Sequence, residues 1–365
     1  MSVPVVSARS PRDLLAFVPH ALGFRPRRCV VVLGIRSERG RVGLTTRTDL
    51  SDLLGPDGPR LAGYLASALV RDGAREVFVA IYDDRPLRDL QVHDAVGSVL
   101  DLLARTPQLP EPVDVVVVGT DRFRSLLCDR EECCPAGGRP VAEIACSEVA
   151  TRFVASGSAP LAGREELAVG REERADVLAD FRRERRLARS RRGPQEDSGR
   201  RRLWRAREAR WIARQCRTGD VTGRDVADHA RLAVAVADSV VRDALMMWVT
   251  LADPSRDAGA LVAPGVQQQW AASPPPAVAP DHASTGALAA WLRVGAALAE
   301  GADRARLLAA GGWLAWHCGE GALAEVLAGQ ALHEDPRHRL ASLTLQLLAR
   351  GVPPAWVHPP GPMVS

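Results

Sequence analysis

The chain has 365 residues, which is enough for two domains that each bury a hydrophobic core. Its composition, 46% hydrophobic and 25% charged, is that of a folded protein and excludes wholesale disorder. No run approaches the roughly 18 uninterrupted apolar residues of a membrane span, and the N-terminus lacks the basic start and apolar region of a secretory signal. We therefore expect a cytoplasmic protein without a membrane partner.

Arginine is the only permanent cation of the chain, because the sequence contains no lysine. It contains no asparagine either, and this composition is typical of a GC-rich genome, so the formal net charge of +4 does not by itself indicate nucleic-acid binding. A chain without lysine has no P-loop lysine, no Schiff-base lysine and no kinase-type lysine. Kinases, P-loop nucleotide hydrolases and pyridoxal enzymes of the usual kind are therefore excluded.

The first half of the chain alternates strand and helix patterns. β-branched runs bounded by turn residues predict strands at 29–35, 41–47, 76–82 and 113–118, with a further short strand at 122–127. Apolar residues at helical spacing predict helices at 60–71, 87–103 and 142–153. The polar residues 37–40 indicate a hairpin between the first two strands. The pattern predicts an α/β domain with a mixed, largely parallel sheet that carries this hairpin at one side.

Four aspartates follow directly after predicted strands, at Asp49, Asp83, Asp84 and Asp121. Ligands of open α/β sheets bind beyond the carboxyl ends of parallel strands, where converging carboxylates can hold Mg²⁺ or perform acid–base catalysis. Aspartate is also a common turn residue and helix cap, which is the simpler explanation of its place after a strand. No G-x-G-x-x-G motif is present, so we expect no dinucleotide cofactor.

Three of the seven cysteines crowd into a turn over 128–140, as Cys128, Cys133 and Cys134, and Cys146 follows. One interpretation is a zinc site made by Cys128, one of the vicinal pair, and Cys146 or a carboxylate. A second is a redox pair, Cys128 with Cys133 or Cys133 with Cys134. A third is a tight Pro/Gly turn whose thiols pack as small hydrophobic side chains. The spacing leaves all three open.

The aromatic residues change type along the chain. Every Phe and Tyr lies at or before Phe181, and every Trp lies at or after Trp204. An arginine-dense stretch begins between them and is interrupted at 193–199 by a Gly/Pro/Ser-containing polar run, which is typical of a linker. We predict an α/β domain over 1–180, an arginine-rich linker region over 181–199 and an all-helical domain over 200–365.

Beyond the linker, Ala- and Leu-rich segments at 224–251, 284–300 and 304–348 have a helical period. The last one places small residues and a proline where a tetratricopeptide repeat has them: Gly312, Ala324, Ala331 and Pro336. The aromatic positions of the repeat are not matched, and only one unit is visible, whereas a stable array needs about three. The pattern therefore predicts one TPR-like helix pair within a helical bundle.

Three arginines of the arginine-dense stretch, Arg201, Arg202 and Arg205, lie with Trp204 and Trp211 on a predicted helix, which could follow a phosphate backbone. Glutamates such as Glu208 are mixed among them, and this mixture favours a solvated helix face. We therefore do not expect nucleic acid to be the main partner.

The chain resembles a family of actinobacterial proteins known as a domain of unknown function, DUF4192. The segments that carry the resemblance are Asp13–Pro26, Arg47–Leu50 and Cys128–Pro140. The resemblance covers nearly the whole chain, including the Ala- and Trp-rich helical part. It implies the same two-part organisation and a bacterial cytoplasmic setting, and it implies no activity.

The first hypothesis for function is a regulatory or interaction protein that joins an α/β domain to a helical protein-binding module. The absence of a complete catalytic motif favours a role without catalysis. The alternative is a metal-assisted hydrolase or phosphotransfer enzyme that uses Asp83, Asp84 and Asp121. A third hypothesis is nucleic-acid binding through Arg200–Arg217. The oligomeric state is not predicted.

Overall fold

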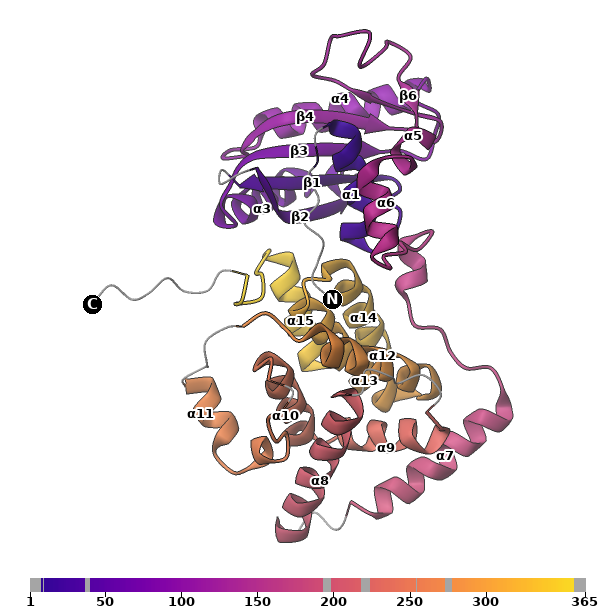
Figure 1. Cartoon of the computed structure of the whole chain (residues 1–365), viewed down its shortest axis with the longest axis vertical. Helices are drawn as coiled ribbons and strands as arrows, with labels where there is room; N and C mark the ends of the chain where they lie inside the picture. The colour runs from indigo at the N-terminus through magenta and orange to yellow at the C-terminus, as the bar shows by residue number, and fades with distance from the viewer. Residues whose placement is uncertain are drawn as a thin grey trace, which may run out of the picture. The chain divides into compact units, whose positions relative to one another are not determined.

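The structure is a computed structural model that describes residues 8, 10–36, 40–192, 198–217, 224–253, 255–272 and 278–357 (Figure 1). The chain divides into two compact units, Met1–Glu166 and Leu167–Ser365. Within the described part of the chain, no helix is both long and apolar enough to cross a membrane. The strands described all belong to the first unit.

The first unit is built on a six-stranded mixed sheet with the order β2-β1-β3-β4-β5-β6. Its strands are β1 (Cys29–Arg36), β2 (Arg41–Asp49), β3 (Ala74–Tyr82), β4 (Glu111–Val118), β5 (Arg122–Ser125) and β6 (Arg139–Pro140). The predicted hairpin is confirmed, since β1 pairs with β2 in antiparallel register from Cys29 opposite Asp49 to Arg36 opposite Arg41. The turn residues 37–39 lie outside the described residues.

Among the strands that the structure describes, β3 pairs with β4 in parallel and the other four pairs are antiparallel. The sequence predicts a mixed sheet correctly, but the expected parallel share is too large. The reason is the strand order: the chain crosses from β2 over β1, so β3 lies beside β1 and runs antiparallel to it. A short turn then joins β4 to β5, and such a turn permits only antiparallel pairing.

Helices cover both faces of this sheet (Figure 1). The helices are α1 (Pro11–Leu22), α2 (Leu50–Leu53), α3 (Gly58–Arg71), α4 (Leu90–Arg105), α5 (Ala142–Ala145) and α6 (Glu148–Ala155), followed by the 3₁₀ turn η1 (Arg164–Leu167). Alternate strand residues pack into two cores: Val30 and Val32 share one with Leu69, while Val31 and Leu33 share the other with Leu15. Burial on both faces explains the unbroken apolar runs of the central strands.

Two helical features of this unit differ from the expectation. The segment predicted as one helix at 142–153 is divided into α5 and α6, because the buried Ser147 caps α6 by accepting a hydrogen bond from the Ala150 backbone N–H at 3.0 Å. The helix α1 has no counterpart among the predicted elements. It begins after Ser10, which accepts from the Asp13 N–H, and ends at Gly23 in the left-handed conformation.

The second unit is helical throughout the residues that the structure describes. Its helices are α7 (Ala175–Ser190), α8 (Ser198–Arg217), α9 (Val226–Val236), α10 (Ser239–Thr250), α11 (Val266–Ala272), α12 (His282–Leu298), α13 (Gly301–His317), α14 (Gly321–Glu334) and α15 (Arg339–Ala349), with the 3₁₀ turn η2 (Ala260–Val262). They share one hydrophobic core that reaches from Val169 to Ala341. The all-helical character predicted for the C-terminal part is confirmed.

The boundary between the units differs from the predicted linker at 181–199. Residues 181–190 belong to α7, which packs on α9 and buries Phe181 and Ala188 two turns apart on one face. The arginines on the other faces of α7 conceal this amphipathic pattern in the sequence. The division lies instead between Glu166 and Leu167, and the Gly/Pro part of the predicted linker, 193–197, is outside the described residues.

Candidate metal centre

The cysteine loop begins where β5 ends, and Ser125 anchors it. The buried Ser125 hydroxyl donates to Asp114 Oδ1 at 2.6 Å and accepts from the Cys128 backbone N–H at 3.0 Å. Burial raises the pKa of Asp114, and the Ser125 hydroxyl partly offsets this effect. Cys128 is therefore tied through one serine to the central strand β4.

The vicinal cysteines are positioned by a backbone turn. The N–H groups of Cys133 and Cys134 both donate to the Arg130 carbonyl, at 3.1 and 2.8 Å. The loop is held down by two arginines of β5, because Arg122 donates to the Gly138 carbonyl at 2.7 Å and Arg124 donates to the Ala136 carbonyl at 3.1 Å. These guanidinium groups hydrogen-bond the loop's backbone carbonyls.

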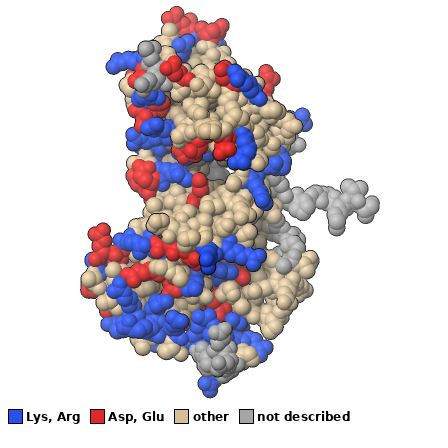
Figure 2. All heavy atoms as spheres, turned by 180° about the vertical axis from the view of Figure 1, so that it is seen from behind, with Lys and Arg blue, Asp and Glu red and all other residues tan. Residues whose placement is uncertain are grey.

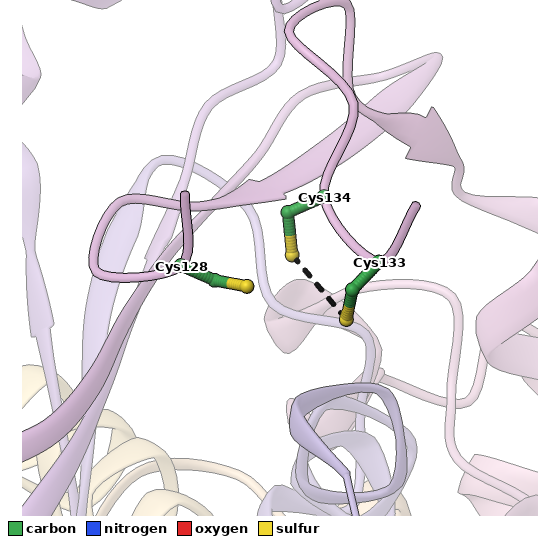
Figure 3. A group of neighbouring side chains, drawn as sticks. All are labelled: Cys128, Cys133 and Cys134. Atoms are coloured by element: carbon green, nitrogen blue, oxygen red, sulfur yellow. Dashed lines mark hydrogen bonds between the residues drawn. The ribbon is translucent and has the colours of Figure 1, made fainter. Parts of the chain in front are cut away.

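The three sulfur atoms point toward one another (Figure 3). The Sγ atoms of Cys133 and Cys134 are 3.8 Å apart, and all three Sγ atoms lie within 4.8 Å of one another. Thiolates on one tetrahedral Zn²⁺, at about 2.3 Å from the metal, are separated by about 3.8 Å. The geometry of the cluster Cys128–Cys133–Cys134 is therefore close to that of three ligands on one ion.

The fourth sulfur of the sequence-based set, that of Cys146, is not in this group. Cys146 lies just after α5 and is exposed. Among the described residues, the three cysteines are the only group of three or more Cys, His, Asp or Glu side chains close enough to hold an ion together. The cluster could thus supply three ligands to one ion, and the described residues offer no fourth ligand beside them.

The three thiols affect one another's ionisation, because their sulfur atoms lie close together. The Arg130 backbone N–H, together with the neighbouring thiols, lowers the pKa of Cys128. Burial and the two neighbouring sulfurs raise the pKa of Cys134 to about 12. Three thiols without a cation therefore cannot all ionise at neutral pH, whereas a bound divalent ion stabilises every thiolate.

The strand-end aspartates lie at one end of the sheet, as the register of Cys29 opposite both Asp49 and Tyr82 requires. Asp49 and Asp83 are each already engaged by a neighbouring arginine. Arg47 donates to both oxygens of Asp49 at 3.0 and 2.5 Å, and Arg85 donates to both oxygens of Asp83 at 2.8 and 2.7 Å. These arginines occupy the oxygen atoms that a metal would need.

Asp121 accepts a hydrogen bond from the Leu87 backbone N–H at 3.0 Å, and Asp84 is partly buried beside Asp83. The Leu87 N–H lowers the pKa of Asp121, and Arg85 lowers the pKa of Asp83. Both groups are therefore anions at neutral pH and are poorly suited to donate a proton. Within the described residues these aspartates do not form a metal-holding group of three.

The arginine-rich helix α8 is an internal element of its unit. Trp204 and Trp211 are 6% and 8% exposed, so their rings are not free to stack on bases. Arg201 and Arg205 bind the buried carboxylate of Asp238, and Glu208 is buried beneath Arg231. Sequence reasoning missed Asp238, because the segment 224–251 was predicted as one helical stretch, whereas the structure ends α9 at Val236 and begins α10 after Asp238.

The chain is thus a two-unit protein that combines a mixed α/β sheet, a three-thiol loop and a helical bundle. Residues 11–355 match the family described as Domain of unknown function (DUF4192), and the chain belongs to this family. No curated protein and no solved structure matches the chain.

Proposed function

We propose that this protein is a cytoplasmic regulatory or interaction protein whose α/β unit is organised by one thiolate-bound metal ion, with Zn²⁺ as the best fit. The observation that carries the proposal is the convergence of the Cys128, Cys133 and Cys134 sulfurs within 4.8 Å. The metal would close the loop over 128–140 as a structural brace. The fourth position would accept a thiol or imidazole from a partner, which makes the centre a point of regulation.

The redox alternative that pairs Cys133 with Cys134 fits the geometry less well. Consecutive α-carbons are about 3.8 Å apart across a trans peptide, which is shorter than the span of about 4.4 to 6.8 Å that disulfides prefer. A bond between Cys133 and Cys134 would therefore be strained. All seven cysteines are free thiols. The sulfur separation favours a shared ion instead.

The packing alternative is weakened by the other cysteines of the same chain. Cys29 and Cys216 are 0% exposed and lie in hydrophobic clusters, as thiols that serve only as apolar filling should. The three loop cysteines are partly exposed and face one another. This difference supports a ligand role for the loop cysteines.

The test is elemental analysis of the purified full-length protein, paired with a count of reactive thiols. We expect about one zinc per chain, lost in Cys133→Ser and retained in the control Cys146→Ser, which removes an exposed thiol outside the cluster. Replacement by Co²⁺ should give thiolate-to-metal charge-transfer absorption that Cys128→Ser weakens. Metal-free protein that also fails to bind added Zn²⁺, with all loop thiols reactive, would refute the proposal.

A second observation supports protein binding by the helical unit. In the pair α13–α14, a Cβ placed on Gly312 would lie 3.2 Å from both the Ala324 carbonyl oxygen and the Ala328 nitrogen. Such close backbone approach, with a left-handed Gly319 in the connecting turn, is what a TPR-like pair requires. On the following helix, Leu343 is 45% exposed.

We therefore propose that α13–α15 bind a protein partner. The full-length chain used as bait should capture a reproducible partner from native lysate, and Leu343→Asp should lose it. The matched control is Leu203→Asp, which places the same charge on the exposed face of α8. Identical capture by the native chain and both variants would contradict a role for this surface.

A further inference from the structure

The helical unit contains a cavity of about 690 Å³ with an unusually cationic lining. The cavity is bordered by the ends of α7 and α8, the junction between α9 and α10, and residues of α13 and α15. Its ionisable lining residues are Arg189, Arg192, Arg201, Arg205, Arg242, Arg306, Asp238 and His338. Figure 2 shows arginine side chains gathering over the helical unit, with carboxylates interspersed.

The cavity's own carboxylate cannot balance this charge. Among the described lining residues, six arginines face one aspartate, which is a surplus of five positive charges when His338 is neutral. Asp238 is 1% exposed in its side chain and is shared by Arg192, Arg201 and Arg205 at 2.9 to 3.0 Å. Arg242 and Arg306 reach Asp243 and Asp303 outside the lining, which still leaves a net positive cavity.

The arginines are crowded as well as numerous. Burial lowers the pKa of Arg192, and repulsion from Arg201 and Arg189 contributes to this shift. The Arg192 Nε atom is buried and has no hydrogen-bond partner among the described residues. Like charges held together in this way destabilise the free protein, and a bound anion would relieve the repulsion.

The backbone adds to the positive potential. The helices α8 and α15 start at Ser198 and Arg339, each at or next to a lining residue, whereas the N-terminus of α10 is already capped by Asp238. Helix N-termini carry partial positive charge and favour anions. The site also holds its arginines in place, since the guanidinium groups of Arg192 and Arg201 lie over the Trp204 ring at 5.5 and 5.4 Å.

We propose that this cavity binds a small molecule carrying two or more phosphate groups. Planar guanidinium forks match phosphate oxygens in bidentate geometry, and a single charge would leave most of the arginines uncompensated. The volume is in the range of small-molecule sites, about 300 to 1,000 Å³. A nucleic-acid strand fits less well, because Trp204 is covered by arginines and offers no surface for base stacking.

The test is calorimetric titration of the full-length protein with pyrophosphate, tripolyphosphate, ATP and orthophosphate at low salt. Arg189→Gln with Arg242→Gln removes two lining charges without touching the Asp238 pairs. The control, Arg182→Gln with Arg210→Gln, removes the same charge from exposed pairs elsewhere in the unit. We expect the cavity double variant to weaken tripolyphosphate binding by roughly tenfold or more, and the control to change it by less than about twofold.

The single variant Arg306→Gln serves as a second lining change should the double variant fold poorly, and it should also weaken binding. Preference for ATP over tripolyphosphate would identify a nucleotide as the ligand class, and equal affinity would identify the polyphosphate group alone. The proposal is overturned if none of the probes binds at millimolar concentration. It is also overturned if orthophosphate binds as tightly as tripolyphosphate, if the control variant loses binding equally, or if a single-stranded oligonucleotide binds and the cavity variants do not affect it.

Discussion

Asp238 has two roles that meet in one buried side chain. Its carboxylate caps α10 by accepting from the Val240 N–H at 3.1 Å and accepts from three arginines at the same time. Burial acts to raise the pKa of Asp238, but Arg201, Arg192 and Arg205 outweigh it and hold the pKa below its ordinary value. The residue is thus an anion that joins α8 and the turn after α7 to the start of α10.

We predict that Asp238→Asn destabilises the helical unit by about 3 to 5 kcal/mol, because it leaves three partly buried arginines without their counter-charge. The control is Asp257→Asn, whose pair with Arg210 is about half exposed and should be worth less than about 1 kcal/mol. Urea denaturation followed by circular dichroism measures both. Equal destabilisation by the two variants would contradict the central role of Asp238.

Two buried histidines make the helical unit sensitive to acid. Burial, followed by the charge of Arg224, lowers the pKa of His229 to about 4, and burial lowers that of His317 to about 4. As the pH is lowered, these two histidines bind protons at about pH 6.5 in the unfolded chain, but only at a lower pH in the folded chain. Stability is therefore full above that pH, falls as the pH drops toward about 4, and loses nothing further from these groups below it.

We predict that His229→Gln with His317→Gln flattens this slope of unfolding free energy between pH 7 and 4, whatever its effect on stability at pH 7. The measurement is urea denaturation at several pH values. His333→Gln, which changes an exposed histidine, should retain the native slope. A double variant with an unchanged slope would show that other groups govern the acid sensitivity.

The cysteine cluster and the arginine site around Asp238 differ in how far their residues could be predicted from the sequence. Cys128, Cys133 and Cys134 lie within one short turn, so their crowding follows from spacing alone. The partners of Asp238 come from 46, 37 and 33 positions away in the sequence, and only the packing of the turn after α7 and of α8 against the start of α10 brings them together. Local patterns contain no information about such distant pairs.

Among the helices, the close packing of α13 on α14 depends on a glycine, Gly312, which has no Cβ atom. The backbone of α14 approaches Gly312 so closely that any Cβ there requires a shift of main-chain atoms. Gly329, in the middle of α14, has no atom within 4 Å of its would-be Cβ. A side chain at Gly312 would therefore contact the neighbouring backbone, whereas one at Gly329 would meet open space, although both glycines occupy helix interiors.

We predict that Gly329→Ala stabilises the helical unit by about 0.5 to 1 kcal/mol through helix propensity. Gly312→Ala should lose that gain and destabilise by about 1 to 2 kcal/mol, because the helices must separate. Chemical denaturation of the two variants gives the comparison directly. Stabilisation by Gly312→Ala of the same size would mean that the helix pair is not closely packed at this point.

Most strands and helices could be predicted from the sequence, but their arrangement in space could not. β-branched runs identify β1, β2, β3 and β4, because both faces of the central strands are buried. The strand order depends on whether β3 is placed beside β1 or beside β2. The hydropathy pattern of β3 would be the same in both places, so the sequence does not distinguish them. The helix α7 was missed because buried residues occupy only one narrow face among many arginines.

In the described part of the molecule, each hydrophobic cluster lies within one of the two units. One cluster lies within 169–341, and the others lie within 15–150. Each unit therefore has a core of its own and can unfold cooperatively by itself.

We predict two transitions in calorimetry of the full-length protein. Asp238→Asn should lower only one of them, and Cys133→Ser or removal of zinc should lower only the other. A single transition that moves as a whole with either change would contradict independent cores. The same scan distinguishes the two proposed ligands, because Zn²⁺ and tripolyphosphate should stabilise different transitions.

The change of aromatic type along the chain has a practical consequence. All eight tryptophans lie from Trp204 onward, in the helical unit, whereas both tyrosines, Tyr64 and Tyr82, lie in the α/β unit. Selective excitation of tryptophan therefore reports on the helical unit alone, without any label. Trp204 lies under two arginines of the cationic cavity, so an anion that draws those guanidinium groups away from the ring should change the tryptophan emission, and Trp204→Phe should abolish this change.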